Sequence, residues 1–107
     1  MLPGTLGKLE ALDEAGDLAA LPERLRVRWR IGGERLRPLG STHTRELRLI
    51  YQEQGVPPWV RDRLPMLYLD KELVNVPGIA ASQRFAERFG KLHIRWRQLS
   101  VVSQNYL

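Results

Sequence analysis

Arginine alternates strictly with large apolar residues over residues 24–31 of this 107-residue chain. The apolar set is Leu25, Val27, Trp29 and Ile31, and arginines occupy the even positions. Successive side chains of a strand point to opposite faces, so the pattern predicts a strand with its apolar face inside. Gly32–Gly33 predicts a tight hairpin turn, because glycine adopts positive φ without a Cβ clash. Glu34–Arg37 would return beside the first strand, which places the arginines at 26, 28, 30, 35 and 37 on one ribbon.

The other patterns predict a single small domain in which strands are combined with one main helix and short helical turns. Expected helical segments are a frayed helix at Leu6–Glu14, the main helix at Arg45–Gln54 closed by Gly55, a short helix from Pro58, and turns at Ser82–Phe89. Expected strands are Met66–Leu69 and Glu72–Val76 around an Asp70-Lys71 turn, and Lys91–Arg97. We interpret residues 1–23 as a connector from an upstream domain, 24–98 as the domain and 99–107 as a tail.

The charge pattern favours an anionic partner. The net charge is +5, and 14 of the 17 basic residues are arginine. Residues 24–48 hold eight arginines against two glutamates, a net charge of +6, so this short stretch is more positive than the chain as a whole. Arginine binds phosphate through paired hydrogen bonds and stacks on bases, which makes nucleic acid the expected partner.

Several classes of protein are disfavoured by what the sequence lacks. Without cysteine there is no disulfide and no cysteine-ligated zinc, and no apolar run approaches the ~18–20 residues of a membrane span. His43 and His93 lie far apart without metal-ligand spacing, so we expect no metal site. Nucleotide-binding glycine loops and nucleophile elbows are also missing. We therefore expect no catalytic residues in this chain and a cytoplasmic location.

The start of the predicted main helix is a candidate phosphate site. Free amides at a helix start attract anions, so Thr42, His43, Thr44 and Arg45 could receive a phosphate, with Arg48 one turn further on. The alternative is that a threonine simply caps the helix and His43 binds a neighbouring loop.

Aromatic and charged residues outside that segment also have two interpretations. Trp29 and Trp96 are expected in the core, whereas Trp59 lies in a proline-bounded loop and could pack on a partner. Arg61 and Arg63 flank Asp62, so one of them could be engaged in a local ion pair.

A long ordered series of motifs resembles one known family. The motifs are Gly33-Glu34-Arg35-Leu36-Arg37-Pro38, His43-Thr44-Arg45-Glu46-Leu47-Arg48, Gln52-Glu53-Gln54-Gly55-Val56-Pro57-Pro58-Trp59, Arg61-Asp62-Arg63-Leu64-Pro65-Met66-Leu67-Tyr68 and Glu72-Leu73-Val74-Asn75-Val76-Pro77-Gly78. Together they resemble the C-terminal domain of bacterial tRNA(Ile)-lysidine synthetase from about Leu25 to Trp96. A single short motif would be far less specific.

The resemblance implies a domain of a cytoplasmic ligase that attaches lysine to the wobble cytidine of tRNA(Ile) with ATP and Mg²⁺. Catalysis in that family belongs to an N-terminal ATP-pyrophosphatase domain, so this fragment should be inactive alone. It would bind the tRNA acceptor stem beside the upstream domains of the enzyme, with a possible homodimer. The related phenylalanyl-tRNA synthetase β-subunit domain implies an α+β fold of layered mixed and antiparallel strands. The expected nucleic-acid-binding residues are Arg35, Arg37, His43, Thr44, Arg45, Arg48, Arg61 and Arg63.

Three departures from the family pattern accompany the resemblance. Gly40-Ser41 stands where the family often has a basic residue, Thr44 replaces a serine while keeping the hydroxyl, and the hairpin glycine near Asp70-Lys71 is missing. The first departure removes an expected phosphate contact. A structural or dimerisation module without base-specific RNA contacts is the alternative function.

Overall fold

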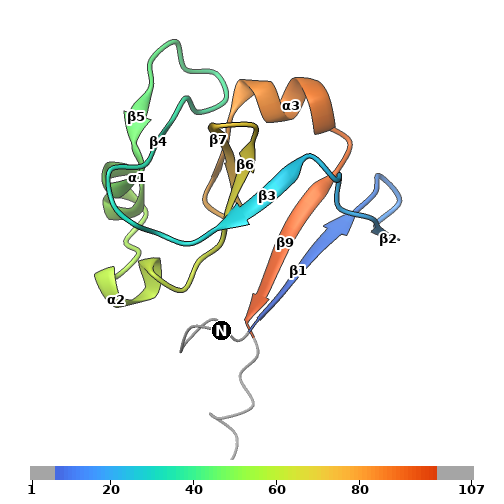
Figure 1. The fold of residues 1–107 in the computed structure, drawn as a ribbon, viewed down its shortest axis with the longest axis horizontal. Helices are drawn as coiled ribbons and strands as arrows, with labels where there is room; N and C mark the ends of the chain where they lie inside the picture. The colour runs from blue at the N-terminus through green and yellow to red at the C-terminus, as the bar shows by residue number, and fades with distance from the viewer. Residues whose placement is uncertain (1–6, 99–107) are drawn as a thin grey trace, which may run out of the picture.

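The computed structural model describes residues 7–98, which form an α+β fold as the sequence predicts (Figure 1). The predicted tail at 99–107 lies outside these residues. The strands are β1 (Gly7–Leu12), β2 (Leu18–Ala19), β3 (Leu25–Arg28), β4 (Arg35–Leu36), β5 (Arg45–Glu46), β6 (Met66–Leu69), β7 (Glu72–Val76), β8 (Ala80–Ala81) and β9 (His93–Gln98). The helices are α1 (Leu47–Glu53), α2 (Pro58–Arg61) and α3 (Gln83–Phe89). None of the helices in the described part is long and apolar enough to cross a membrane.

A central antiparallel sheet of order β3-β6-β7-β8 separates two apolar cores. Alternate residues of β6 enter opposite cores: Met66 packs with α1, and Leu67 packs with Phe85 and Ile94. Figure 1 shows α1, β4 and β5 on one side of this sheet and the β2-β1-β9 sheet on the other. The central strands are therefore buried on both faces, as expected where layers cover a sheet on each side.

The elements around β6 and β7 confirm the sequence prediction closely. Both strands have the predicted bounds, and Asp70 makes their turn with φ +58°. Asp70 thus takes the left-handed conformation in a turn where the family resemblance led us to expect a glycine, and aspartate tolerates this conformation better than most residues. Arg24 and Arg84 both bind its carboxylate, at 2.9 and 3.0 Å, and the hydrogen bond from Arg24 is the main reason why the pKa of Asp70 is lowered.

The helix predicted at Leu6–Glu14 is wrong for the residues described. Gly7–Leu12 is strand β1, which pairs antiparallel with β9 along its whole length. Glycine is required at its start, because a Cβ on Gly7 would overlap the ring of Trp96. Ala11 is buried in the core beside Ile94. Gly7 and Ala11 are too small to mark the apolar face of a strand, so the alternation in β1 is not visible in the sequence. The spacing of the leucines therefore predicts a helix instead of a strand.

The hairpin predicted at Gly32–Gly33 is also wrong. β3 pairs with β6, and β4 pairs with β5, so the two segments that flank the glycines do not pair with each other. The Glu34 carboxylate accepts hydrogen bonds from the amides of Ile31 and Gly32, and the Glu34 carbonyl accepts one from Leu47. These bonds direct the chain toward α1 instead of back along β3. The single arginine ribbon is therefore not formed.

The burial predicted from the alternation is correct for Arg24, Arg26 and Arg28 but not for Arg30, whose side chain is 23% exposed, and it is only partly correct for the apolar positions. Arg26 and Arg28 are exposed, and Leu25 packs against the core. Val27 and Ile31, however, are 43% and 90% exposed. β3 is an edge strand, so its side chains have a neighbouring strand on one side only. Trp29 packs edge-to-face on Trp96 with ring centroids 5.8 Å apart, and both are half-buried.

Glu10 provides a pH-dependent link between β1 and β9. Its side chain is 5% exposed and accepts two hydrogen bonds from Arg95, with Arg97 at 3.7 Å. The Arg95 hydrogen bond lowers the pKa of Glu10. A carboxyl with a lowered folded-state pKa stabilises the fold above its ordinary pKa of about 4.3 and loses this effect as pH falls further.

We expect Glu10→Gln to lower the melting temperature at neutral pH, and the deficit to vanish once both proteins are studied below the folded-state pKa of Glu10. Thermal unfolding of both proteins across pH measures the difference between their melting temperatures. The remaining carboxylates are the same in both proteins, so their titration does not contribute to this difference. If the melting temperature of Glu10→Gln is lower by the same amount at every pH, then Glu10 stabilises the fold through its packing and not through its charge.

Candidate nucleic-acid interface

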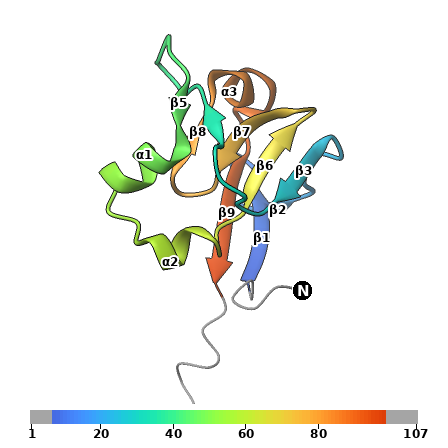
Figure 2. The ribbon, with the colours of Figure 1, turned by 60° about the vertical axis from the view of Figure 1, so that its left-hand side comes forward.

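The β4–β5 hairpin presents much of the predicted binding set. Cα partners are Arg35 with Glu46 and Leu36 with Arg45. Leu36 is buried against α1, so the alternation of a strand points Arg35 away from the core. Arg35 and Arg37 are both exposed, and neither has a carboxylate partner within residues 7–98. Figure 2 shows the hairpin projecting beyond the sheets.

The loop between the two strands is held by its own hydrogen bonds. Arg37 Nε donates to the Ser41 carbonyl at 3.1 Å, and Ser41 Oγ accepts from the His43 amide at 3.1 Å while donating to its carbonyl at 3.0 Å. The Leu39 amide ties the loop to Ala81 at 2.9 Å. His43 and Thr44 are consequently exposed on an ordered loop.

The predicted helix start at Thr42–Arg45 is wrong. Arg45–Glu46 is strand β5, and α1 begins at Leu47 with Glu46 as an N-cap whose side chain makes no capping bond. Pairing with β4 uses the backbone of Arg45, so this segment offers no helix dipole to a phosphate. Any anion bound here would contact side chains and loop amides instead.

Arg45 and Arg48 are engaged within the fold. Both terminal nitrogens of Arg45 bind the Glu53 carboxylate, which joins the hairpin to the end of α1 and lowers the pKa of Glu53. Arg48 lies 3.4 Å from Glu46. Exposed pairs of this kind contribute little stability, and Arg48 can exchange its partner more readily than the doubly bound Arg45.

Arg61 is engaged within the fold, whereas Arg63 is not bound to a carboxylate in the described part of the chain. Arg61 Nε donates to the Val56 carbonyl at 2.9 Å, and its guanidinium lies 5.5 Å from the centre of the Tyr51 ring. Arg63 is exposed. The local ion pair predicted with Asp62 is wrong, because Asp62 lies 3.8 Å from Arg30, and neither neighbouring arginine pairs with it.

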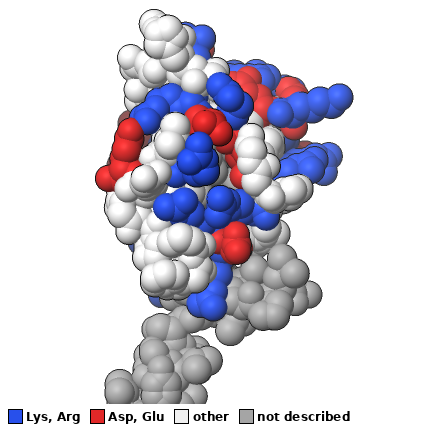
Figure 3. All heavy atoms as spheres, turned by 90° about the vertical axis from the view of Figure 1, so that its left-hand side faces the viewer, with Lys and Arg blue, Asp and Glu red and all other residues white. Residues whose placement is uncertain are grey.

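Basic side chains outside the predicted set share the exposed surface. Figure 3 faces the side of α1, α2 and β5 and shows basic groups across it with acidic groups among them. Arg26, Arg28 and Lys71 have no carboxylate partner in the described part of the chain. Alternation in 24–31 signals the two arginines, whereas no pattern singles out Lys71.

Comparison with known families decides which group the chain belongs to. The profile of a family described as "TilS substrate C-terminal domain" matches residues 25–97, which is more than half of the chain. The chain belongs to this family. The resemblance read from the motifs is confirmed.

Members and relatives of the TilS C-terminal family match over most of this chain. A tRNA(Ile)-lysidine synthase of Yersinia pseudotuberculosis serotype I is 34% identical over 85 residues, or 77% of this chain and 18% of the relative. That of Coxiella burnetii is 37% identical over 87 residues, 78% of this chain and 19% of the relative. The chain thus spans less than a fifth of the length of these relatives. A solved structure titled "Crystal structure of TILS C-terminal domain" aligns with TM-score 0.55 and 28% identity over 85% of this chain and 70% of the other.

Tyr51 occupies the centre of the α1 core in this TilS C-terminal domain and leaves one polar atom without a partner. The residue is 0% exposed, and its hydroxyl makes no hydrogen bond within the described residues. Burial is the main cause that raises the pKa of Tyr51 to about 12. An unsatisfied buried hydroxyl costs about 1–3 kcal/mol.

We expect Tyr51→Phe to stabilise the fold by about 1–3 kcal/mol, because the ring keeps its packing and the hydroxyl no longer loses hydration. Urea unfolding of the two proteins measures this change, and an unchanged slope with denaturant confirms that both unfold alike. A loss of stability would show that the hydroxyl is hydrogen-bonded in solution.

Proposed function

We propose that this chain is the tRNA-binding C-terminal domain of a tRNA(Ile)-lysidine synthase and that it grips phosphates of the acceptor stem. The observation that supports this most is the β4–β5 hairpin, which exposes Arg35 on β4 and Arg37, His43 and Thr44 on the hydrogen-bonded loop that follows. The deep major groove of A-form RNA excludes ordinary side-chain readout, so phosphate and shape contacts suit a projecting basic hairpin. Arg48 and Arg63 extend the proposed surface, while Arg45 and Arg61 position the hairpin and α2.

The proposed parent enzyme ligates lysine to the wobble cytidine of tRNA(Ile) in the cytoplasm. ATP, Mg²⁺ and lysine would bind the upstream domains of that enzyme, and this chain would provide no reacting group. The basis is the curated relatives, of which this chain matches less than a fifth. In this proposal the fragment is inactive alone and acts by holding the tRNA.

Binding of the chain to a tRNA(Ile) transcript and to an acceptor-stem variant, titrated across salt, tests the proposal. Each neutralised phosphate should add ~0.7–0.9 to the slope of log affinity against log salt. A steep slope with preference for the cognate stem supports recognition, and a steep slope without preference supports an electrostatic anchor only. Absence of binding at physiological salt, together with self-association in sedimentation, would support a structural or dimerisation module instead.

A further inference from the structure

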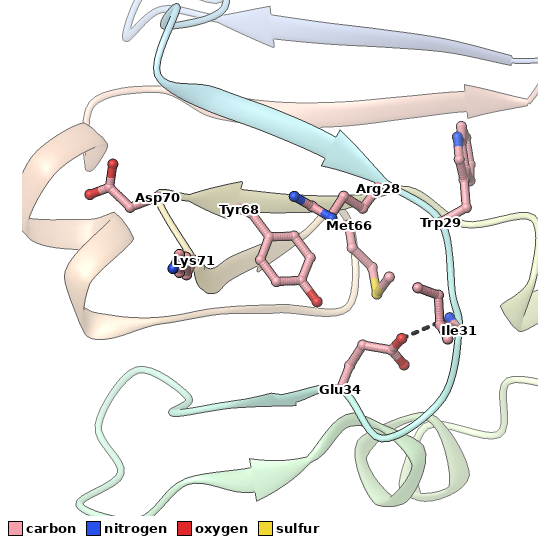
Figure 4. A pocket seen from close by; sticks show the side chains of 8 residues that line it. All are labelled: Arg28, Trp29, Ile31, Glu34, Met66, Tyr68, Asp70 and Lys71. Carbon is pink, nitrogen blue, oxygen red and sulfur yellow. Dashed lines mark hydrogen bonds between the residues drawn. The ribbon is translucent and has the colours of Figure 1, made fainter.

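A hollow of about 340 Å³ opens at the edge of the central sheet, away from the β4–β5 loop. Figure 4 shows Arg28 of β3 and Tyr68 of β6 on one side of it and the Ile31–Glu34 loop on the other. Met66, which is buried, lies between them. The volume falls in the range of ~300–1,000 Å³ that small-molecule sites occupy.

The loop that forms one wall is preorganised. Glu34 Oε2 accepts hydrogen bonds from the amides of Ile31 at 2.8 Å and Gly32 at 2.9 Å. Gly32 and Gly33 have φ of +116° and +81°, which other residues rarely adopt. These constraints hold the 90% exposed side chain of Ile31 at the rim of the hollow. A fixed apolar side chain in this position is suited to packing against a ligand.

The opposite wall offers an aromatic ring and cations. The Arg28 guanidinium lies 5.5 Å from the centre of the Tyr68 ring, and the hydroxyl of Tyr68 has no hydrogen-bond partner within residues 7–98. Lys71 stands at the end of the hollow. The two acidic groups nearby are already engaged, because Asp70 binds two arginines and Glu34 binds the loop amides. The available groups are therefore an aromatic face, an apolar side chain, a hydroxyl and two cations.

We propose that this hollow binds a single unpaired base of the RNA, stacked on Tyr68 with Ile31 against it and the adjoining phosphates on Arg28 and Lys71. Stacking of a base on an aromatic ring is stronger than an exposed cation–π contact, so Arg28 leaves the ring for a phosphate as the base enters. The proposal rests on the proposed function, since it needs RNA. It adds to that function a site for unpaired nucleotides that gripping a duplex does not require.

The test compares two RNA hairpins of one sequence, one blunt and one with a single-stranded extension that contains the fluorescent adenine analogue 2-aminopurine. We expect the 107-residue chain to bind the extended hairpin about tenfold more tightly and to quench the analogue. Ile31→Ser and Tyr68→Leu should abolish this gain while leaving the affinity for the blunt hairpin unchanged. Tyr68→Phe should keep the gain, because the stacking surface remains. Leu18→Ser, which changes a 67% exposed leucine elsewhere, is the matched control.

The possible outcomes distinguish a failure of the proposed base site from a failure of the proposed tRNA-binding function. Equal affinity for both hairpins without quenching would overturn the base site and leave the proposed function standing. No binding of either hairpin by the unmodified chain would overturn both. If Ile31→Ser and a folded Tyr68→Leu, checked by circular dichroism, keep the full gain, the base binds elsewhere and the hollow is not its site.

Discussion

Changing both Arg35 and Arg37 to alanine should weaken binding of tRNA about 30-fold at moderate salt. Both guanidinium groups are exposed and have no carboxylate partner within the described residues. Arg37 Nε donates to the Ser41 carbonyl, so its terminal nitrogens are left for a phosphate, and each phosphate contact is worth about 1 kcal/mol. Losing two such contacts should also lower the slope of log affinity against log salt by about 1.5. Fluorescence anisotropy with labelled tRNA across a salt series measures both quantities.

Arg24→Ala with Arg84→Ala is the matched control, because it removes the same charge from side chains already bound to Asp70 and Glu72. We expect this control to change the affinity by only a few-fold through the general field of the protein. If the two double variants lose equal affinity, net charge explains the binding, and the hairpin is not a specific site.

Local signals were sufficient for the elements around β6 and β7. Both strands are short apolar runs ended by turn residues, Asp70-Lys71 between them and Pro77-Gly78 after them, so their bounds follow from neighbouring residues. The short helix at Pro58 follows from a proline at its first turn, and Ser82 caps α3 through the Phe85 amide. No distant partner had to be known.

Strand pairing across the chain could not be predicted in this way. β1 pairs with β9 from the other end of the domain, and β3 pairs with β6 across two helices and the β4–β5 hairpin. Alternation specifies that a segment is a strand but not which strand lies beside it. The Gly32–Gly33 turn therefore suggested the nearest partner, although the Glu34 hydrogen bonds direct the chain elsewhere.

In the candidate site, too, some features could be predicted from the sequence and others depend on contacts between distant segments. Residue types and the family resemblance indicated the basic hairpin, but not which arginines have local partners. Arg45 binds Glu53 eight residues away, and Arg61 binds the Val56 carbonyl. Such engagement depends on how β5 meets α1 and how α2 packs on Tyr51, which composition does not encode. Whether the predicted residues contact RNA stays a prediction.

The pair Val27 and Leu67 provides the sharpest test of where the core lies. They are direct partners across β3 and β6, yet Leu67 is 0% exposed and Val27 is 43% exposed. Leu67→Ala should destabilise the domain by about 2–5 kcal/mol, since it opens a cavity between the central sheet, α3 and β9. This is a large part of the ~5–15 kcal/mol that holds a typical domain folded.

Val27→Ala should cost less than about 1 kcal/mol, because part of the side chain is already hydrated and only edge-strand packing is lost. Urea unfolding of both variants beside the unmodified chain measures the contrast, and a common slope with denaturant shows that the unfolding transitions are comparable. The alternation of residues 24–31 alone places Val27 inside and therefore predicts a large loss for Val27→Ala as well. Similar losses would therefore mean that another layer covers Val27 in solution, whereas a several-fold difference would establish that the Val27 face of β3 is only partly covered.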